Sequence, residues 1–192
     1  MKLAIFGGTF NPVHTGHLAL VDDVRNTLGY DLILLVPANI PPHKDLADGA
    51  SAADRLAMLR LATDGVSFLG VEDCELERGG LSFTIDTLGF LEEKYAGKIE
   101  GKIGLIIGQD LIAGFQTWKN AAGIAEKADI IVAKRPLSGT EAFMYPYRPL
   151  ENPLLSISSS EIRDRIASAK SWRYLVPDPV YRYIVEHHLY EH

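Results

Sequence analysis

Two histidines near the N-terminus have a spacing that suits phosphate binding. His14 and His17 lie within "GGTFNPVHTGHL" (7–18), which directly follows the apolar run "LAIF". Each imidazole can donate an N–H to a phosphate oxygen in either protonation state. The glycines let the backbone approach a ligand without an intervening Cβ. A helix that begins near Gly16 would direct backbone N–H groups and its positive dipole end at the same anion.

This stretch differs from the common nucleotide-binding motifs. It lacks the spacing of GxGxxG, and it is not GxxxxGK[ST]. A tight glycine turn with locally satisfied histidines is the ordinary alternative, and for a single histidine it would be the better interpretation. Because "HTGH" stands between a glycine turn and a helix start, we interpret it as a phosphate site.

A second candidate phosphate site lies near the other end of the chain, in "ISSSEIR" (157–163). Ser158, with Glu161 three residues later, has the capping-box spacing that begins a helix. The N–H groups and serine hydroxyls of that helix start can hold phosphates, and Arg163 can offer a fork of donors to the same anion. Alone, the segment would be an ordinary capping box with a solvated arginine. Together with "HTGH", it predicts a site for the β- and γ-phosphates of a nucleotide.

The two motifs together resemble the signature of the nucleotidyltransferases that carry "HxGH" and "ISSTxIR". Within that group the chain is similar to the nicotinate-nucleotide adenylyltransferases over essentially its whole length, in "PPHK" (41–44), "SFTIDTL" (82–88), "GQD" (108–110), the tryptophan at 118 and "KRP" (134–136). The resemblance implies transfer of AMP from ATP to nicotinate mononucleotide, which yields nicotinate adenine dinucleotide and pyrophosphate. It also implies Mg²⁺ bound through the ATP phosphates.

The resemblance assigns roles to individual residues. The catalytic residues would be His14, His17 and Arg163. The ATP contacts would be Gly7, Gly8, Thr9, Phe10, His14, His17, Gly108, Asp110, Arg135, Ser158, Ser159, Ser160 and Arg163. The acceptor contacts would be Asn11, Lys44, Thr84, Trp118 and Lys119, and no residue would ligate a metal directly. Asn11 stands where aspartate is common and Ser160 where threonine is common, and both keep the capacity to hydrogen bond.

The implied chemistry needs positioning rather than a general base. The attacking phosphate monoester has a second pKa of about 6, so it is largely dianionic at neutral pH. The protein must then hold the reactants in line and stabilise charge on the α-phosphate and on the departing pyrophosphate. His14 and His17 are the candidates for the α-phosphate, and the segment 158–163 is the candidate for the pyrophosphate.

Several of these residues have a structural alternative. Trp118 could be a core anchor or a face on which a pyridine ring stacks. Thr84 could cap its helix, or its hydroxyl and the neighbouring amides could bind the nicotinate carboxylate. Asp110 could contact a ribose hydroxyl or cap a helix, and the sequence leaves both alternatives open. Lys44 and Arg135 are interpreted as phosphate contacts only because of the resemblance.

A preference for the nicotinate over the nicotinamide nucleotide needs donors aimed at a carboxylate and no nearby carboxylate to repel it. Thr84 offers a hydroxyl and an N–H at a predicted helix start, and Lys119 offers a further backbone N–H beside Trp118. A neutral amide in the same place would leave buried groups without partners. We therefore expect the acid to be used and the amide to be a poor acceptor.

Positioning these residues requires a sheet that brings several strand ends together. The predicted strands lie at 2–6, 32–37, within 66–76, 102–108 and 128–135. The predicted helices lie at 16–28, from 51, about 85–95, within 110–127, 159–169 and 178–188, and 136–153 is expected to be a loop.

This alternation predicts an α/β fold, a doubly wound, mostly parallel, Rossmann-like sheet with right-handed crossovers and a small helical C-terminal part. The segments 7–17, 37–44, 108–110 and 134–135 each follow a predicted strand. Because ligands bind beyond the carboxyl ends of parallel strands, these segments should share one face.

Composition limits the remaining possibilities. The 192 residues, 47% of them hydrophobic, suit one nucleotidyltransferase domain over 1–192, with 154–192 as a helical subregion that carries "ISSSEIR". The net charge of -6 argues against nucleic-acid binding. No apolar run approaches the roughly 18 residues of a membrane span. The lone Cys74 and the lack of a signal-peptide pattern favour the cytoplasm, and the oligomeric state, including a homo-oligomer, stays open.

Other functions are also open from the sequence. One is adenylyl transfer to nicotinamide mononucleotide or to phosphopantetheine. The chain is somewhat long for a phosphopantetheine enzyme, which needs neither the tryptophan nor the "SFT" segment. Another is a nucleotide sensor without catalysis, which would be expected to lose His17 or Arg163, and both are present.

Overall fold

The computed structural model describes residues 1–40, 49–134 and 143–191. Lys44 and Arg135, two predicted phosphate contacts, lie outside the described residues. The strands are β1 (Leu3–Gly8), β2 (Leu32–Pro37), β3 (Leu69–Val71), β4 (Ile103–Gly108), β5 (Ala128–Ala133) and β6 (Arg148–Leu150). The helices are α1 (Thr15–Leu28), α2 (Ala52–Thr63), α3 (Cys74–Arg78), α4 (Thr84–Lys94), α5 (Ala121–Lys127), α6 (Ser159–Ala167) and α7 (Asp178–Glu186). Three 3₁₀ turns complete the described part, η1 (Gln109–Leu111), η2 (Phe115–Thr117) and η3 (Arg173–Leu175).

The described strands form one sheet in the order β3-β2-β1-β4-β5-β6. Every pairing between neighbouring strands is parallel. The chain builds outward from β1 to β3, then places β4 on the other side of β1 and continues to β6. The strand order therefore reverses between β1 and β4, the position at which open α/β sheets bind ligands. The predicted doubly wound, parallel architecture is confirmed.

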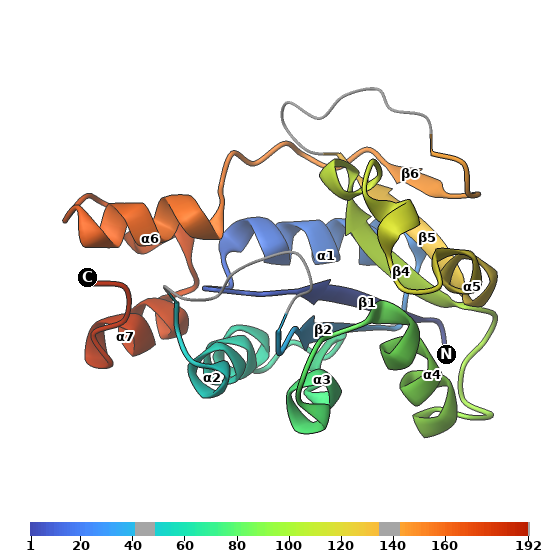
Figure 1. Ribbon diagram of the computed structural model, residues 1–192. Helices are drawn as coiled ribbons and strands as arrows, with labels where there is room; N and C mark the ends of the chain where they lie inside the picture. The colour runs from blue at the N-terminus through green and yellow to red at the C-terminus, as the bar shows by residue number, and fades with distance from the viewer. Residues whose placement is uncertain (41–48, 135–142, 192) are drawn as a thin grey trace.

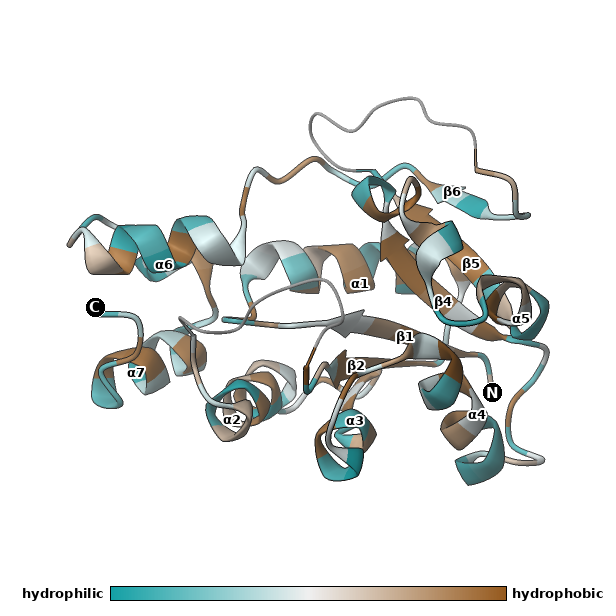
Figure 2. Cartoon of the chain, viewed as in Figure 1, coloured by the Kyte–Doolittle hydropathy of each residue, from teal (hydrophilic) through white to brown (hydrophobic). Residues whose placement is uncertain are grey.

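Alternate residues of the strands face two different layers of helices. Ile33 and Ile131 belong to a buried cluster with α1, α2, α6 and α7. Leu34 and Ile130 belong to a second cluster with α3, α4 and α5. Because both faces of the sheet are covered, the strands are nearly continuous apolar runs. Figure 2 shows this in the hydrophobic β4 and β5, and Figure 1 shows α6 and α7 together at the end of the molecule away from β6.

Local capping signals begin and end the helices where the sequence predicts. Gly29 has a left-handed backbone (φ 69) and ends α1. The Ser51 hydroxyl accepts the N–H of Asp54 at 3.1 Å and begins α2. The Ser158 hydroxyl accepts the N–H of Glu161 at 3.1 Å and begins α6. The start of the second motif is therefore confirmed as a capped helix.

The expectation of a loop over 136–153 was wrong in part. Arg148–Leu150 form β6, which pairs in parallel with residues Ile131 to Ala133 at the edge of the sheet. Only Leu150 of these three residues is buried. Pro149 cannot donate a backbone hydrogen bond, which an edge strand tolerates. A strand this short, with a proline at its centre, has no apolar alternation to reveal it.

Other boundaries differ by a few residues. The strand expected within 66–76 is only β3, because α3 begins at Cys74. The region 110–127, where one or two helices were expected, holds α5 and, before it, two 3₁₀ turns. The helix expected to reach about Tyr95 ends at Lys94.

Candidate active site

The loop after β1 places both histidines at the start of α1. His14 is the N-cap residue and is only 2% exposed, while His17 lies in the first turn and is half-buried. Their rings stack with centroids 3.6 Å apart. The backbone N–H of His14 donates to Nδ1 of His17 at 3.2 Å. Because Nδ1 is the acceptor in this bond, a neutral His17 carries its proton on Nε2, from which it can donate to an anion.

Aromatic packing holds the His17 ring in place. Phe10 and Phe6 contact it edge-on, with ring centroids 5.0 Å and 5.8 Å away. Phe10 is 2% exposed and has a left-handed backbone (φ 49), a conformation that residues other than glycine rarely adopt. Its side chain supports the histidines from the core, so the predicted contact of Phe10 with ATP would use the backbone.

The glycines of the motif have different tasks. A Cβ at Gly16 would lie 3.0 Å from Nδ1 of His14, and a Cβ at Gly8 would lie 3.1 Å from the Phe10 ring. These two glycines therefore make room for the rings that pack around them. Gly7 has open space where its Cβ would be and is exposed, so it leaves the backbone accessible at the strand end.

Helix α6 docks on this loop, so motifs from opposite ends of the chain lie together. The Ser159 hydroxyl donates to the carbonyl of Pro12 at 2.8 Å. The Arg163 guanidinium donates to the carbonyl of Asn11 at 2.8 Å and to the Ser160 hydroxyl at 3.4 Å. These hydrogen bonds join the second motif to the backbone of the first. Arg163 binds the carbonyl of Asn11, which lies three residues before His14 in the same loop.

A surface recess adjoins the histidines. Its lining comes from the start of α1, the end of β5 and the segment that leads into α6: His14, Gly16, His17, Ala19, Leu20, Lys134, Asn152, Pro153, Leu154, Leu155 and Ile157. Lys134 pairs with Glu151, and its backbone N–H donates to the Asn152 side chain at 2.7 Å. Lys134 is a cation among the described residues that line this recess; the predicted phosphate contact Arg135 lies outside the described residues.

The end of β4 contributes another predicted ATP segment. Gly108 is buried and is the N-cap residue of η1. Asp110 is exposed and lies inside η1, so it does not begin that turn, which was one of its two predicted roles. Because β4 neighbours β1, this segment lies at the point where the strand order reverses.

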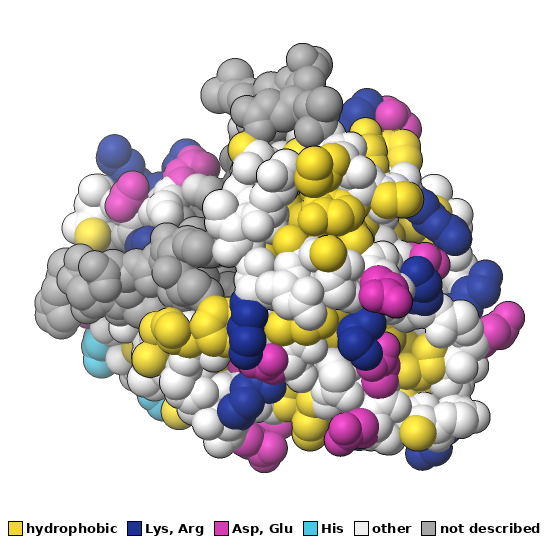
Figure 3. Space-filling view, turned by 45° about the vertical axis from the view of Figure 1, so that its right-hand side comes forward, with side chains coloured by type: hydrophobic (Ala, Val, Ile, Leu, Met, Phe, Trp, Pro, Cys, Tyr) yellow, Lys and Arg dark blue, Asp and Glu magenta, His cyan; other side chains and the backbone are white. Residues whose placement is uncertain are grey.

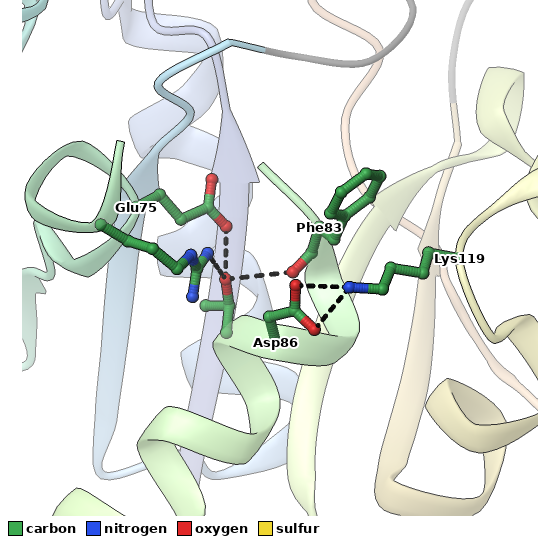
Figure 4. A network of polar contacts seen from close by, with 6 residues as sticks. Glu75, Phe83, Asp86 and Lys119 are labelled. Atoms are coloured by element: carbon green, nitrogen blue, oxygen red, sulfur yellow. Dashed lines mark hydrogen bonds and ion pairs between the residues drawn. The ribbon is translucent and has the colours of Figure 1, made fainter. Parts of the chain in front are cut away.

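Three of the predicted acceptor residues, Thr84, Trp118 and Lys119, lie at the start of α4 and after η2. Thr84 is the first residue of α4 and is half-buried. Trp118 follows η2 and packs on Phe115 with ring centroids 4.9 Å apart, yet it stays half-exposed. Lys119 extends toward α4 (Figure 4), and its Nζ lies 4.6 Å from the centroid of the Phe83 ring.

A carboxylate lies beside these residues, which sequence reasoning did not foresee. Asp86 is in the first turn of α4, two residues after Thr84. Its two oxygens accept hydrogen bonds from Nζ of Lys119 at 2.9 Å and 3.1 Å, as Figure 4 shows. An ion pair of this kind compensates the carboxylate charge locally. The expectation that no carboxylate lies near Thr84 was therefore wrong: Asp86 lies there, and Lys119 compensates its charge.

A buried polar network around the Thr87 hydroxyl holds the first turn of α4 against α3. The Thr87 hydroxyl donates to the Glu75 carboxylate at 2.5 Å, and both residues are buried. Arg78 approaches the same hydroxyl at 3.4 Å, and the Phe83 carbonyl lies 3.4 Å away (Figure 4). The network joins α3 to α4, so the position of Thr84 depends on α3 as well as on its own helix.

Sequence reasoning missed Arg55, on α2. Its side chain is 2% exposed, and its guanidinium donates to the carbonyls of Thr9 at 2.9 Å and Ala38 at 2.7 Å. It thereby joins the loop after β1 to the loop after β2. Burial lowers the pKa of Arg55. Among the described residues neither Arg55 nor Arg163 hydrogen bonds to a carboxylate, which leaves two positive charges beside the "HTGH" loop.

The helical pattern of α2 could have revealed Arg55. Arg55 shares the buried face of α2 with Met58, Leu59 and Ala62, which follow it at spacings of three, four and seven. A charged residue on an apolar stripe must find polar partners in the interior. Tyr190, whose hydroxyl donates to Oδ1 of Asn11 at 2.7 Å, was also missed, and no local pattern points to that contact.

The described surface shows mixed charge. On the face in Figure 3, Lys and Arg side chains alternate with Asp and Glu side chains rather than forming a continuous stripe. Within the described ranges, no three His, Cys, Asp or Glu side chains are grouped so that they could hold a metal ion. None of the helices that could be searched in this part of the chain combines the length and apolarity needed to cross a bilayer.

Comparisons with known proteins agree with this geometry. Residues 5–165 match the family described as Cytidylyltransferase-like. A Treponema pallidum (strain Nichols) protein named "Probable nicotinate-nucleotide adenylyltransferase" is 40% identical over 202 residues, which covers 99% of both chains. A protein of the same name from Gloeobacter violaceus is 40% identical over 201 residues, which covers 99% of this chain and 96% of that protein.

Among solved structures, Plasmodium falciparum nicotinic acid mononucleotide adenylyltransferase complexed with NaAD has the same fold. Its TM-score is 0.82 at 20% identity, with 99% of this chain and 97% of that chain covered. The chain therefore belongs to the cytidylyltransferase-like family and, within it, to the nicotinate-nucleotide adenylyltransferases.

Proposed function

We propose that the protein transfers AMP from ATP to nicotinate mononucleotide and forms nicotinate adenine dinucleotide and pyrophosphate. The observation that carries the proposal is the docking of α6 on the loop after β1, through Ser159 on Pro12 and Arg163 on Asn11. This docking brings the oriented imidazole of His17, the guanidinium of Arg163 and the starts of α1 and α6 together near the reversal of the strand order between β1 and β4. The full-length similarity to proteins named for this activity supports the same reaction.

In this mechanism His17 stabilises the α-phosphate. The acceptor's phosphate is already largely dianionic at neutral pH, so the attack needs no general base. Charge that develops on the α-phosphate oxygens is met by the Nε2–H of His17. The bond from the His14 backbone to Nδ1 and the stacked rings hold that donor in place before substrate arrives. A preorganised donor of this kind requires no reorganisation as the reaction proceeds.

The start of α6 and Arg163 hold the departing pyrophosphate. The N–H groups of the first turn of α6 and the hydroxyls of Ser158 and Ser160 suit an anion, and the helix dipole adds attraction, whereas the Ser159 hydroxyl is donated to Pro12. Arg163 has five N–H donors, and its contacts with Asn11 and Ser160 leave others for phosphate oxygens. Lys134 adds a cation in the recess beside the histidines.

We further propose that Mg²⁺ accompanies ATP and is held mainly by its phosphates. Mg²⁺ usually keeps several waters and binds through substrate phosphates and one or two carboxylates rather than in an all-protein cage. When bound, it would neutralise charge on the phosphates. Activity should be lost when a chelator is added and should return with excess Mg²⁺, whereas full activity in excess chelator would contradict this part of the proposal.

The acceptor would bind between the start of α4 and Trp118. Thr84 offers its hydroxyl and N–H to the nicotinate carboxylate, and the half-exposed Trp118 offers a face for the pyridine ring. The Lys119–Asp86 pair beside them contributes no net negative charge. A positive helix end with a compensated carboxylate favours an acid over a neutral amide.

One assay tests the proposal. The purified chain is given ATP, Mg²⁺ and, separately, nicotinate mononucleotide, nicotinamide mononucleotide or phosphopantetheine, and pyrophosphate release is measured. Release with the nicotinate nucleotide should exceed release with the other two by at least about tenfold in kcat/KM. The His17→Ala variant, purified in parallel, shows whether the release comes from this site. Preference for another acceptor would replace the proposed function, and nucleotide binding without release would favour a sensor.

A further inference from the structure

The segment after α7 returns to the loop that carries the first motif. The Tyr190 hydroxyl donates to Oδ1 of Asn11 at 2.7 Å, between residues 179 positions apart in the chain. The same oxygen accepts the N–H of Ala50 at 3.0 Å. Burial raises the pKa of Tyr190, so the hydroxyl stays protonated and acts as the donor. Asn11 is 6% exposed, and its side-chain oxygen has two protein donors.

Asn11 is a junction between four segments of the chain. Its side chain binds Tyr190 and the backbone before α2, while its backbone carbonyl accepts Arg163 at 2.8 Å. The carbonyl of the following residue, Pro12, accepts Ser159 at 2.8 Å. The orientation of the Asn11 side chain and the orientation of this peptide are therefore coupled, because both are held by hydrogen bonds within one residue.

The backbone that delivers Tyr190 is itself unusual. His188 and Tyr190 have φ values of 50° and 68°, in the left-handed region that residues with a Cβ rarely occupy. Such conformations cost free energy and persist where surrounding contacts determine them. The contacts here are the packing of Tyr190 against the cluster shared by α1, α2 and α7, and its hydrogen bond to Asn11.

We propose that Tyr190 is a positioning residue for adenylyl transfer, which acts through Asn11 on Arg163 and on the "HTGH" loop. Without the hydroxyl, Oδ1 of Asn11 keeps only the Ala50 donor, and the residue whose carbonyl Arg163 binds loses one of the hydrogen bonds that fix its orientation. His14 lies three residues further along the same loop. This inference rests on the proposed function, because it concerns the arrangement of phosphate-binding groups for that reaction.

The chain offers a matched control for this contact. The Tyr183 hydroxyl donates to Oδ1 of Asp54 at 2.9 Å, so it also joins α7 to the region of α2. Its acceptor belongs to the cap of α2 and has no described contact with the "HTGH" loop. Tyr183→Phe and Tyr190→Phe each remove one hydroxyl from a hydrogen bond to a side-chain oxygen. Only the second change affects the residue that Arg163 contacts.

The test measures kcat, KM for each substrate and the melting temperature of both variants in the full chain. Tyr190→Phe is expected to lower kcat by about 5- to 30-fold with KM for ATP changed by less than about threefold, because small misplacements act mainly on the transition state. Tyr183→Phe is expected to keep kcat within about twofold of wild type, while its melting temperature falls by about as much as that of Tyr190→Phe. Equal effects of the two variants on kcat would overturn the inference.

A double-mutant comparison tests the route through Asn11. Asn11→Leu should lower kcat at least as much as Tyr190→Phe, and adding Tyr190→Phe to Asn11→Leu should lower it little further. Losses that multiply would show that Tyr190 acts by another path and would refute the proposal. If the wild-type chain releases no pyrophosphate with any acceptor, the proposed function fails and this inference fails with it. If the wild type is active and Tyr190→Phe matches it, only this inference fails.

Discussion

His17 is the residue on which the proposed chemistry depends most directly. His17→Ala removes the Nε2–H donor and also the ring that stacks on His14 and contacts Phe10. Removing one preorganised donor from a site of this kind lowers kcat by about 10²- to 10³-fold, or about 2.7–4 kcal/mol of transition-state stabilisation. Because the contact strengthens in the transition state, KM for ATP should change much less than kcat.

Two further variants separate the donor from the packing of the ring. Gln at position 17 can place an amide N–H near the position of Nε2, whereas Asn is too short and places it near Nδ1. His17→Gln should therefore recover part of the activity that His17→Ala loses, and His17→Asn should recover little. The tautomer assigned from the His14 N–H to Nδ1 contact makes this order specific, since it identifies Nε2 as the donor atom.

Steady-state pyrophosphate release gives kcat and KM for each variant, and thermal unfolding shows whether the variant is folded. The aromatic contacts of His17 mean that His17→Ala should also lower the melting temperature, so all rates are compared below the melting temperature of that variant. A kcat within about threefold of wild type in folded His17→Ala would refute the role of His17 in catalysis. Higher activity in His17→Asn than in His17→Gln would refute the assignment of Nε2.

Three other predictions concern the acceptor, the thiol and the acid limit of stability. Thr84→Val should lower kcat/KM for the nicotinate nucleotide selectively, by about 10-fold or more, whereas Trp118→Ala should lower kcat/KM for both pyridine nucleotides. If Thr84→Val lowers kcat/KM equally for the two nucleotides, the proposed carboxylate pocket is contradicted. Burial, with the carboxylates of Glu72 and Glu75, raises the pKa of the Cys74 thiol to about 12, so at pH 8 only about one thiol in ten thousand is ionised. The native chain should therefore react with a thiol reagent far more slowly than the chain unfolded in urea. Equal rates would contradict the burial of Cys74. The Ser51 hydroxyl, with a further hydrogen bond from Tyr183, lowers the pKa of Asp54 below 3.8. Its contribution to stability is therefore present well above the unfolded pKa and is lost as the pH falls through the lower folded value. The urea midpoints of wild type and Asp54→Asn should differ at pH 6, and the difference should shrink as the pH falls below about 4. A gap that persists at the lower pH would point to a different cause.

Local patterns in the sequence determined most of the fold. The caps at Ser51 and Ser158 and the left-handed Gly29 lie where their residue types predict, because each is satisfied by neighbours within three or four residues. The apolar runs of β1, β2, β4 and β5 indicate a sheet covered on both faces, and alternation with helices makes it parallel. The segments after β1 and β4 lie at one edge because parallel strands end at the same edge, whereas the second motif reaches the first through the docking of α6.

Contacts made across long stretches of chain were decided only by the tertiary structure. Arg55 donates to carbonyls at the ends of two neighbouring strands, and carbonyls carry no residue-specific signal in a sequence. Strand β6 forms because Ile131 to Ala133 leave an edge open to pair, although its own three residues show no alternation. The ion pair of Lys119 with Asp86 joins residues 33 positions apart, and it changes the charge of the proposed acceptor site.

Asn11 shows, within one residue, the difference between what the sequence predicts and what the tertiary structure decides. The resemblance implied that Asn11 contacts the acceptor. In the folded chain its oxygen binds Tyr190 and Ala50, and its carbonyl binds Arg163. The sequence by itself shows that a side chain able to hydrogen bond stands at this position in the first motif. Which groups it contacts depends on where α2, α6 and the segment after α7 come to lie around the sheet, because hydrogen bonds are specified by the distance and direction between atoms rather than by separation along the chain.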